Sequence, residues 1–400
     1  MASVITSNTC LPLNDFQFFN FDNHMKTLFQ VLFLSLLCYA CGSSEKQQQT
    51  KDYIEIDMVP LIEGKAKEMP LQEWAKSVRF IPLETNEDIL IAGIGNVFQR
   101  GDTLLVYHTG RLSLFDMNGK YLYDIGSKGQ GPEEFTYVRD VLVHDNLIYV
   151  QEHNNRFKVY DWNGNFVKKL VLPHKVSGLI TYPGKEEMLA YVNNRTGDES
   201  VRFYVMKDEQ ILDSVPNPFL YKRGPGAITL IHIPEFYASR GSLSVFTEQN
   251  SDTVYRVDEY LQTHPYVVFH MGKYLYTRQE RFNTTAGDMK GTTFDHKHDF
   301  FALGEIENNI FIRKGSGNPR NDRTYYYNKQ TKEVHKLFLT YPKSGLDFLK
   351  GVSFTPRIIE ELSLHEEASF VPRTILDNKY LVDWEQPDND ENLVLVLVEP

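Results

Sequence analysis

The stretch LFDMNGKY at residues 114–121 returns as VYDWNGNF at residues 159–166, and the two glycines, Gly119 and Gly164, lie 45 residues apart. Each copy places an Asn-Gly pair between two strand-like segments. Asn-Gly accepts a positive φ at both central positions of a tight turn, and that twist matches the twist of a β-hairpin. A repeat of about 45 residues has the size of one four-stranded blade of a β-propeller.

Weaker copies of the repeat follow along the chain, near residues 203–209, 253–258 and 325–331. The alternation of apolar and polar residues predicts four strands in each of the first two repeats. These strands are expected at residues 91–100, 103–108, 111–116 and 121–126, and then at 138–144, 147–152, 157–161 and 166–172. Three further repeats are expected over residues 176–216, 228–270 and 295–340.

A sixth repeat needs both ends of the chain. The strands at residues 375–384 and 393–398 are expected to pair with an early strand at 78–83, which closes the ring and removes an exposed sheet edge. A short helix is expected near residues 356–364. The sequence therefore predicts an all-β fold: a six-bladed β-propeller of four-stranded antiparallel blades, closed by pairing of the N- and C-terminal strands.

The composition agrees with a β protein and excludes some functions. Aromatic residues make up 13% of the 400 residues, and aromatics favour strands. The net charge is −11 and no dense basic stretch occurs, so we expect no nucleic-acid binding. The three cysteines are Cys10, Cys38 and Cys41. No cysteine follows residue 41, so the expected propeller has no disulfide, thiolate nucleophile or cysteine-ligated metal.

The N-terminal segment has the pattern of a secretory signal. An apolar run at residues 28–37 follows Met25 and Lys26, and it is shorter than the roughly 20 residues that span a bilayer. Residues 1–24 contain Asp15 and Asp22 and do not fit such a signal, so we expect translation to start at Met25.

The segment Ala40-Cys41-Gly42 resembles the lipobox of bacterial lipoproteins, in which the cysteine is diacylated and becomes the mature N-terminus. In this chain Cys38 stands where that family usually has leucine, and an ordinary cleaved signal peptide is the alternative. The resemblance implies stable anchoring to a membrane through Cys41. The expected organisation is an over-extended start at 1–24, a lipoprotein signal peptide at 25–40, a flexible polar tether at 41–51, and the propeller at 52–400.

Two further resemblances concern the propeller. The sequence IGSKGQGPEEF at residues 125–135 resembles the Ile-Gly-x-x-Gly-x-Gly-Pro-x-x-Phe signature of NHL-repeat propellers. The segments VRFIPLET at 78–85 and NSDTVY at 250–255 are similar to motifs of a Gram-negative lipoprotein family known as six-bladed β-propeller proteins of unknown function. This resemblance implies a location at the cell envelope, on the periplasmic or surface face of the outer membrane. It also implies a part in nutrient uptake or envelope signalling, and no chemistry.

The sequence contains few patterns typical of catalysis. The glycines at residues 126–131 lack the Lys-Ser/Thr ending and the following helix of a phosphate-binding loop, so we interpret them as a turn between blades. Neither a Gly-x-Ser-x-Gly nor a His-Glu-x-x-His motif occurs. Glu133 and Glu134 are neighbours, which point to opposite sides of a strand, so they are not expected to form an acid–base pair.

Asp295, His296 and His298 form the densest titratable cluster. Two histidines at i and i+2 share one face of a strand, and with a carboxylate they are weak candidates for a metal site. Lys297 and the aromatic neighbours favour a simpler interpretation, a charged loop that leads into a strand at 300–304. No cofactor is expected.

Two functions from different classes remain. We favour a monomeric, non-catalytic binding module that takes a glycan, a peptide or an envelope protein at the face lined by loops. The alternative is a metal-dependent hydrolase similar to calcium-dependent lactonases, with its site at the channel mouth. That chemistry requires polar side chains from different blades to converge, and a shared fold does not establish it. The candidates are Asp140, Glu152, Asn193, Glu248 and Asp295.

Overall fold

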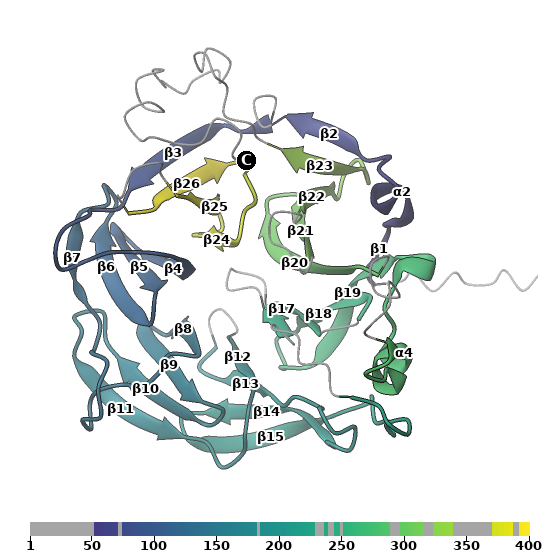
Figure 1. The fold of residues 1–400 in the computed structure, drawn as a ribbon, viewed down its shortest axis with the longest axis horizontal. Coiled ribbons are helices and arrows are strands. Elements are labelled where there is room, and N and C mark those ends of the chain that lie inside the picture. The colour runs from purple at the N-terminus through teal and green to yellow at the C-terminus, as the bar shows by residue number, and fades with distance from the viewer. Residues whose placement is uncertain are drawn as a thin grey trace, which may run out of the picture. The chain divides into compact units, whose positions relative to one another are not determined.

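Six β-sheets form a ring (Figure 1). The computed structural model describes residues 52–70, 74–181, 185–228, 236–238, 244–248, 251–288, 297–315, 323–338, 370–386 and 392–400. The predicted six-bladed β-propeller is confirmed: each sheet contains four antiparallel strands, and the chain passes from one blade to the next around the ring. The short helix expected near residues 356–364 lies outside the described residues.

The first three blades follow one another directly in the sequence. Blade 1 is β4 (Ile94–Arg100), β5 (Thr103–His108), β6 (Arg111–Asp116) and β7 (Tyr121–Asp124). Blade 2 is β8 (Asp140–His144), β9 (Leu147–His153), β10 (Arg156–Tyr160) and β11 (Phe166–Val171). Blade 3 is β12 (Gly178–Thr181), β13 (Met188–Tyr191), β14 (Val201–Lys207) and β15 (Gln210–Pro216).

The remaining blades complete the ring. Blade 4 is β16 (Phe236–Ala238), β17 (Val245–Glu248), β18 (Thr253–Val257) and β19 (Thr263–His270). Blade 5 is β20 (Asp299–Ile306), β21 (Asn309–Gly315), β22 (Arg323–Asn328) and β23 (Val334–Phe338). Blade 6 is β24 (Thr374–Leu376), β25 (Tyr380–Glu385), β26 (Val394–Glu399) and β3 (Ser77–Pro82).

The ring closes through antiparallel pairing of β3 with β26, in a register that runs from Ser77 opposite Glu399 to Pro82 opposite Val394. This is the closure that the sequence predicts. Two short strands add to it. β1 (Ile54–Asp57) and β2 (Lys67–Pro70) each pair in parallel with the outermost strand of a blade, β1 with β19 and β2 with β23 (Figure 1). Blades 4 and 5 therefore have five strands, and their outer edges are covered.

The repeated turns differ in detail from the expected Asn-Gly turn. Gly119 and Gly164 have φ angles of +85° and +84°, but the asparagine before each of them does not have a positive φ. The reason is the aspartate at the end of the third strand. The carboxylate of Asp116 accepts hydrogen bonds from the backbone N–H groups of Asn118 and Lys120, both at 2.8–2.9 Å. This bonding makes a longer loop that needs one left-handed residue.

The glycine-rich segment at 125–135 is a turn between blades 1 and 2, as the sequence predicts. Ile125 and Phe135 are buried in the cluster that joins these two blades. Gly126 has a φ of +63°, and a Cβ at this position would lie 2.8 Å from the ring of Tyr160. The carboxylate of Glu134 accepts a hydrogen bond of 2.7 Å from the N–H of Gly131, which fixes the loop.

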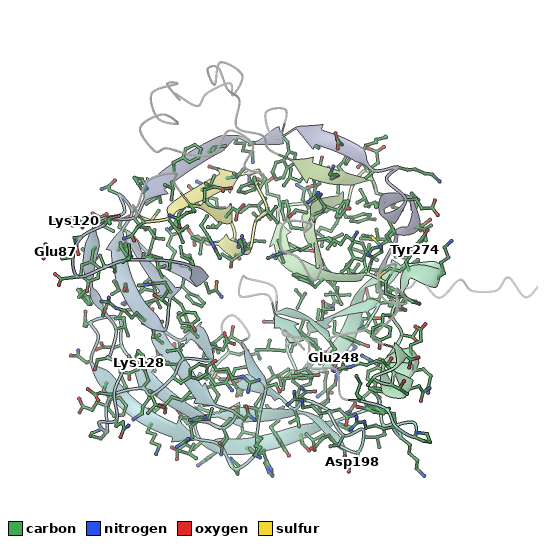
Figure 2. The ribbon with its side chains drawn as sticks, viewed as in Figure 1. Glu87, Lys120, Lys128, Asp198, Glu248 and Tyr274 are labelled. Carbon is green, nitrogen blue, oxygen red and sulfur yellow. The ribbon has the colours of Figure 1, made fainter. Side chains whose placement is uncertain are left out.

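The antiparallel order determines which loops share a face of the ring. In each blade the second and fourth strands run in the same direction. The segments that follow β13, β15, β17 and β19 therefore leave blades 3 and 4 on one face. The last of these segments holds the 3-10 helix η1 (Gly272–Tyr274) and the helix α4 (Arg278–Asn283). In Figure 2 the labelled Glu248 lies further inside the ring than Asp198, which is at the rim.

The helices of the described ranges are short. Besides η1 and α4, they include α2 (Val59–Ile62) between β1 and β2. None of the helices in this part of the chain is long and apolar enough to cross a membrane.

Candidate functional site

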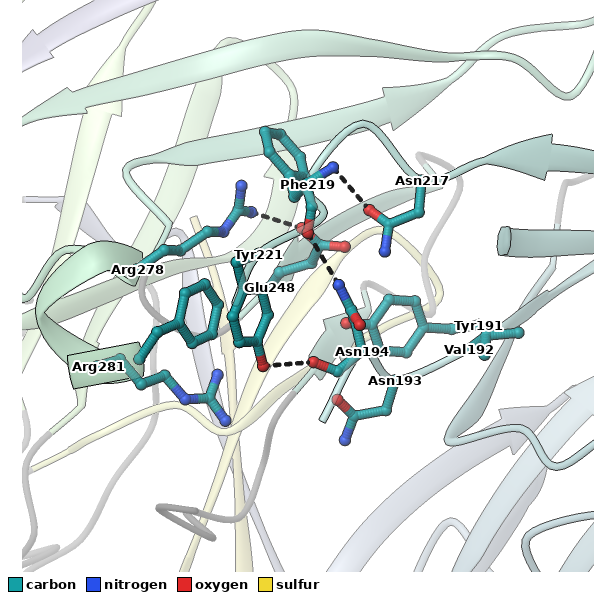
Figure 3. Close-up of a pocket in the computed structure, with 11 residues that line it drawn as sticks. Tyr191, Val192, Asn193, Asn194, Asn217, Phe219, Tyr221, Glu248, Arg278 and Arg281 are labelled. Carbon is teal, nitrogen blue, oxygen red and sulfur yellow. Dashed lines mark hydrogen bonds and ion pairs between the residues drawn. The ribbon is translucent and has the colours of Figure 1, made fainter. Parts of the chain in front are cut away.

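A pocket lies on this face, where the loops of blades 3 and 4 meet α4 (Figure 3). The pocket is a half-open hollow, and the hollow together with the open solvent in front of it occupies about 450 Å³. Four aromatic side chains, three amides, two guanidinium groups and one carboxylate line it, together with Val192. Its walls therefore combine flat apolar surfaces with polar groups, which is typical of small-molecule sites.

Glu248 forms the base of this polar cluster. It is the last residue of β17, and it is 8% exposed. Its Oε1 accepts a hydrogen bond of 2.9 Å from Nε of Arg202, and its Oε2 accepts one of 2.6 Å from Nη2 of Arg278. Each carboxylate oxygen is thus held by a different guanidinium. Because Arg202 belongs to β14, the pair also connects blade 3 to blade 4.

Arg202 is 3% exposed and lies behind the pocket among aromatic rings. Its guanidinium carbon is 4.3 Å from the ring centre of Tyr255 and 5.2 Å from that of Phe246. Burial works against its charge, but the carboxylate of Glu248 and the hydroxyl of Tyr255 together hold the pKa of Arg202 above its usual value. The arginine is therefore a permanent buried cation that depends on Glu248.

Phe219 is fixed in the pocket wall by two asparagines. Its backbone N–H donates to Oδ1 of Asn217 at 3.0 Å, and its carbonyl accepts from Nδ2 of Asn194 at 2.8 Å (Figure 3). The guanidinium of Arg278 lies over its ring, 3.7 Å from the ring centre. This close stacking places a cation directly beside an aromatic surface.

Tyr221 joins the loop after β15 to α4. Its ring stacks on that of Phe282, with 6° between the ring planes. Its hydroxyl donates to the carbonyl of Asn194 at 2.9 Å (Figure 3). The loop and the helix are therefore held in one arrangement by both an apolar and a polar contact.

The start of α4 is fixed by a capping box. The hydroxyl of Thr277 accepts a hydrogen bond from the N–H of Glu280 at 3.2 Å, and the Glu280 carboxylate accepts one from the N–H of Thr277 at 2.8 Å. This arrangement satisfies two N–H groups that a helix start otherwise leaves unpaired. It also orients Arg278 and Arg281, which follow in the same helix and line the pocket.

The polar groups of the pocket divide into those already used and those available to a ligand. The amides of Asn194 and Asn217 are fully engaged with the backbone. The amide of Asn193 makes no hydrogen bond to any residue in the described ranges. Within the same ranges, Arg278 donates to Glu248 and keeps further N–H groups without a partner. What the pocket offers is mainly hydrogen-bond donors.

The structure brings together two of the five residues expected to converge. Asn193 and Glu248 both line the pocket. Asp140 and Glu152 lie in blade 2, where each has a local partner: Asp140 accepts from the N–H of Val141 at 2.8 Å, and Glu152 accepts from the N–H of Thr136 at 2.9 Å. In the part of the chain that the structure describes, no group of three His, Cys, Asp or Glu residues is placed to hold a metal.

Most of the residues predicted to bind a metal or to carry a lipid lie outside the described part of the chain. Asp295, His296 and Cys41 lie outside the described residues, so these predictions remain predictions. His298 precedes β20. Its backbone N–H donates to the carbonyl of Tyr274 at 2.9 Å, and its ring centre is 6.0 Å from that of Tyr274.

Sequence reasoning missed Arg278, Arg281 and Phe219. The motif Thr277-x-x-Glu280 is a visible signal for the start of α4, because a capping box has this spacing. No comparable signal marks Phe219, which lies in an irregular loop.

Two further titratable groups lie at the ends of second strands, the half-buried Glu385 and the buried His108. In blade 6, burial and the nearby charge of Asp383 raise the pKa of Glu385 to about 8. In blade 1, burial and the nearby charge of Arg111 lower the pKa of His108 to about 4. His108 Nε2 lies 2.8 Å from the hydroxyl of Ser113, which donates onward to Asp124. This hydrogen-bond chain stays inside blade 1.

Comparison with known proteins adds a family and a fold. A family model described as "Domain of unknown function (DUF4934)" matches residues 54–399. None of the curated proteins matches the chain. Among solved structures, the chain is similar to a protein from Bacteroides fragilis described as an inferred exported protein, with 15% identity, a TM-score of 0.55, and coverage of 87% of this chain and 99% of that chain.

Two other solved structures are more distant. A streptogramin B lyase has 11% identity and a TM-score of 0.39, with coverage of 81% of this chain and 98% of that chain. A protein of unknown function from Bacteroides thetaiotaomicron has 11% identity and a TM-score of 0.42, with coverage of 81% and 76%. At its level of identity, the Bacteroides fragilis likeness concerns the fold alone.

Proposed function

The chain belongs to the DUF4934 family of domains of unknown function, and from this premise we propose that it is a ligand-binding module held outside the cytoplasm by a lipid on Cys41. The observation that carries the proposal is the pocket between blades 3 and 4. There, fixed aromatic walls surround the amide of Asn193 and N–H groups of Arg278 that have no partner among the described residues. These groups recognise and hold a molecule.

The pocket is preorganised, which supports binding. Hydrogen bonds hold Phe219 and Tyr221 in place, and a capping box holds the helix that carries Arg278. Side chains that are already ordered lose little conformational entropy when a ligand arrives, so more of the contact energy appears as affinity.

The secretory signal and the lipobox-like segment around Cys41 support a location at the outer membrane. Residues 42–51 lie between the proposed lipid and the first described residue, Asp52, and they are polar. A flexible chain of this length spans about 17 Å on average, enough to hold a domain close to the bilayer. The description of the similar Bacteroides fragilis protein as an inferred exported protein agrees with this proposal.

The anchor is tested by labelling cells with radioactive palmitate. We expect the full chain to carry label and to sediment with outer membranes, because acyl chains on Cys41 hold it there. Cys41→Ala should lose the label and leave the membrane, whereas the matched control Cys38→Ala should keep both. Membrane attachment that survives in Cys41→Ala contradicts the lipid anchor.

The pocket is tested by thermal unfolding of the full chain with a panel of neutral sugars, sugar acids and short peptides. A ligand raises the unfolding midpoint because it binds the folded state. Asn193→Trp places a large ring in the pocket wall. The matched control, Asn308→Trp, places the same ring outside the pocket, at an exposed turn in blade 5. We expect a panel member to stabilise the native chain and Asn308→Trp but not Asn193→Trp. Equal stabilisation of both variants refutes the pocket as the site.

A further inference from the structure

We infer that the pocket takes a carboxylate carried on a sugar ring, as in a hexuronic acid; this inference rests on the proposed binding function and specifies its ligand. It is based on three properties of the pocket: its charge, its remaining hydrogen-bond donors, and the position of its cations beside flat apolar rings.

The charge of the pocket is opposite to that of the protein. The whole chain has a net charge of −11, but Arg278 and Arg281 line the pocket against a single carboxylate, Glu248. Arg202 adds a third guanidinium directly behind Glu248, at 2.9 Å. The site therefore has a local excess of positive charge, and this excess attracts an anion within a Debye length of about 8 Å.

The hydrogen-bonding state of Glu248 decides which kind of anion fits. Both of its oxygens already accept from arginines and the residue is buried, so little of the carboxylate is within reach of a ligand's hydroxyl or amine. Arg278 keeps N–H groups that have no partner in the described ranges. A guanidinium presents its donors in a planar fork, which fits the two oxygens of a carboxylate.

The aromatic walls explain why the carboxylate belongs on a ring. The cation of Arg278 lies 3.7 Å above the ring centre of Phe219 and covers that face of the ring, so the charged group is part of the aromatic wall. A pyranose has flat patches of C–H groups that pack on an aromatic face such as that of the half-buried Tyr221, which also lines the pocket (Figure 3). In a hexuronic acid the carboxylate is attached directly to that ring.

Asn193 supplies the remaining specificity. Its amide is both a donor and an acceptor and has no partner among the described residues, so it suits a sugar hydroxyl, which is also both. The side chain lies on the segment after β13, across the pocket from α4 (Figure 3). A ligand that spans the pocket meets guanidinium groups at one end and an amide at the other.

The test is calorimetric titration of the full chain with D-galacturonate and D-glucuronate, each beside its neutral counterpart, D-galactose or D-glucose. N-acetylglycine serves as a carboxylate without a sugar ring, and a trimer of galacturonate distinguishes a chain from a single sugar acid. We expect a uronate, free or as the trimer, to bind at least ten-fold more tightly than its neutral counterpart.

The variants separate the role of the pocket arginines from a general effect of charge. Arg281→Gln and Arg278→Gln should weaken uronate binding about 10- to 100-fold, the effect of losing one hydrogen bond to a charged group. Arg156→Gln, at an exposed arginine of blade 2 on the same face, should leave it unchanged. If Arg278→Gln fails to fold because Glu248 loses a partner, Arg281→Gln still gives the result.

Three outcomes overturn the inference. The first is equal binding of galactose and galacturonate, the second is uronate binding that Arg281→Gln leaves unchanged, and the third is binding of N-acetylglycine or peptides in preference to uronates. If such binding is lost in Asn193→Trp, the acidic sugar is refuted while the binding pocket stands. If no compound shows binding that depends on Asn193, both proposals fail.

Discussion

Gly119 and Gly164 provide a matched pair that tests how the ring is closed. Both occupy the same turn in neighbouring blades, with φ angles of +85° and +84°. Their surroundings differ. A Cβ on Gly119 would lie 1.9 Å from the carbonyl oxygen of Pro82, whereas a Cβ on Gly164 would lie 3.3 Å from that of Asp124. Pro82 is the last residue of β3, the strand that closes the propeller.

The structure gives a different magnitude for each alanine variant. Both variants place a side chain at a left-handed position, which costs about 1 kcal/mol or somewhat more. Gly119→Ala must also move the backbone at Pro82, and overpacking of this kind costs about 1–3 kcal/mol. The shift also strains the 2.8 Å hydrogen bond from the N–H of Glu84 to the carbonyl of Gly119. We expect the free energy of unfolding to fall by about 1 kcal/mol in Gly164→Ala and by about 3 kcal/mol or more in Gly119→Ala.

Urea denaturation measures the two losses, and hydrogen exchange locates them. In Gly119→Ala the amides of β3 and of its partner β26 should exchange faster than in the native chain, because the closing strand is displaced. In Gly164→Ala these amides should keep their protection. Equal loss of stability in the two variants, or unchanged exchange at β3 in Gly119→Ala, would refute the role of this contact in closure.

Three further predictions concern buried or half-buried titratable groups. Glu248→Ala removes the carboxylate that holds buried Arg202, so the free energy of unfolding should fall by about 3–5 kcal/mol in urea denaturation. The folded state raises the pKa of Glu385 from 4.5 to about 8, so it favours the neutral acid; stability should fall as pH rises through this range, and Glu385→Gln should remove that loss. The folded state lowers the pKa of His108 from 6.5 to about 4, so stability should fall as pH decreases through that range. His108→Gln should lack this component in pH-dependent unfolding curves.

The fold was predictable because its determinants are local. The strands expected at residues 103–108 and 111–116 coincide with β5 and β6. Apolar alternation identifies both strands, and the turn that contains Asp116 and Gly119 ends the second one. The pairing of 78–83 with the C-terminal strands was also correct. β1 and β2 were not predicted. Each has four residues and adds to the edge of a finished blade, so the partner strand decides its position more than its own pattern does.

The turn shows where a local rule gave the wrong geometry. Asn-Gly favours a two-residue turn in isolation, but Asp116 and Asp161 bind the backbone N–H groups of the loop and lengthen it. The blade 4 turn confirms that the aspartate is the common element. There Asp258 makes the same pair of hydrogen bonds, and Leu261, with a φ of +61°, takes the place of the glycine.

The site was less predictable because it depends on contacts between blades. Glu152 and Glu248 are residues of the same type at the ends of second strands, and both are buried. Their sequence positions give no reason to prefer one. Glu152 accepts hydrogen bonds from the N–H and the hydroxyl of Thr136, in the segment that leads into blade 2. Glu248 instead accepts hydrogen bonds from Arg202 of blade 3 and from Arg278 of α4. A propeller repeats its blades, so equivalent positions acquire different chemistry from substitutions within a strand, such as Arg202 in β14, and from segments that break the repeat. In this chain those segments are the loop after β15 and the helix after β19, and variation within the family at these two segments should change the ligand while leaving the blades intact.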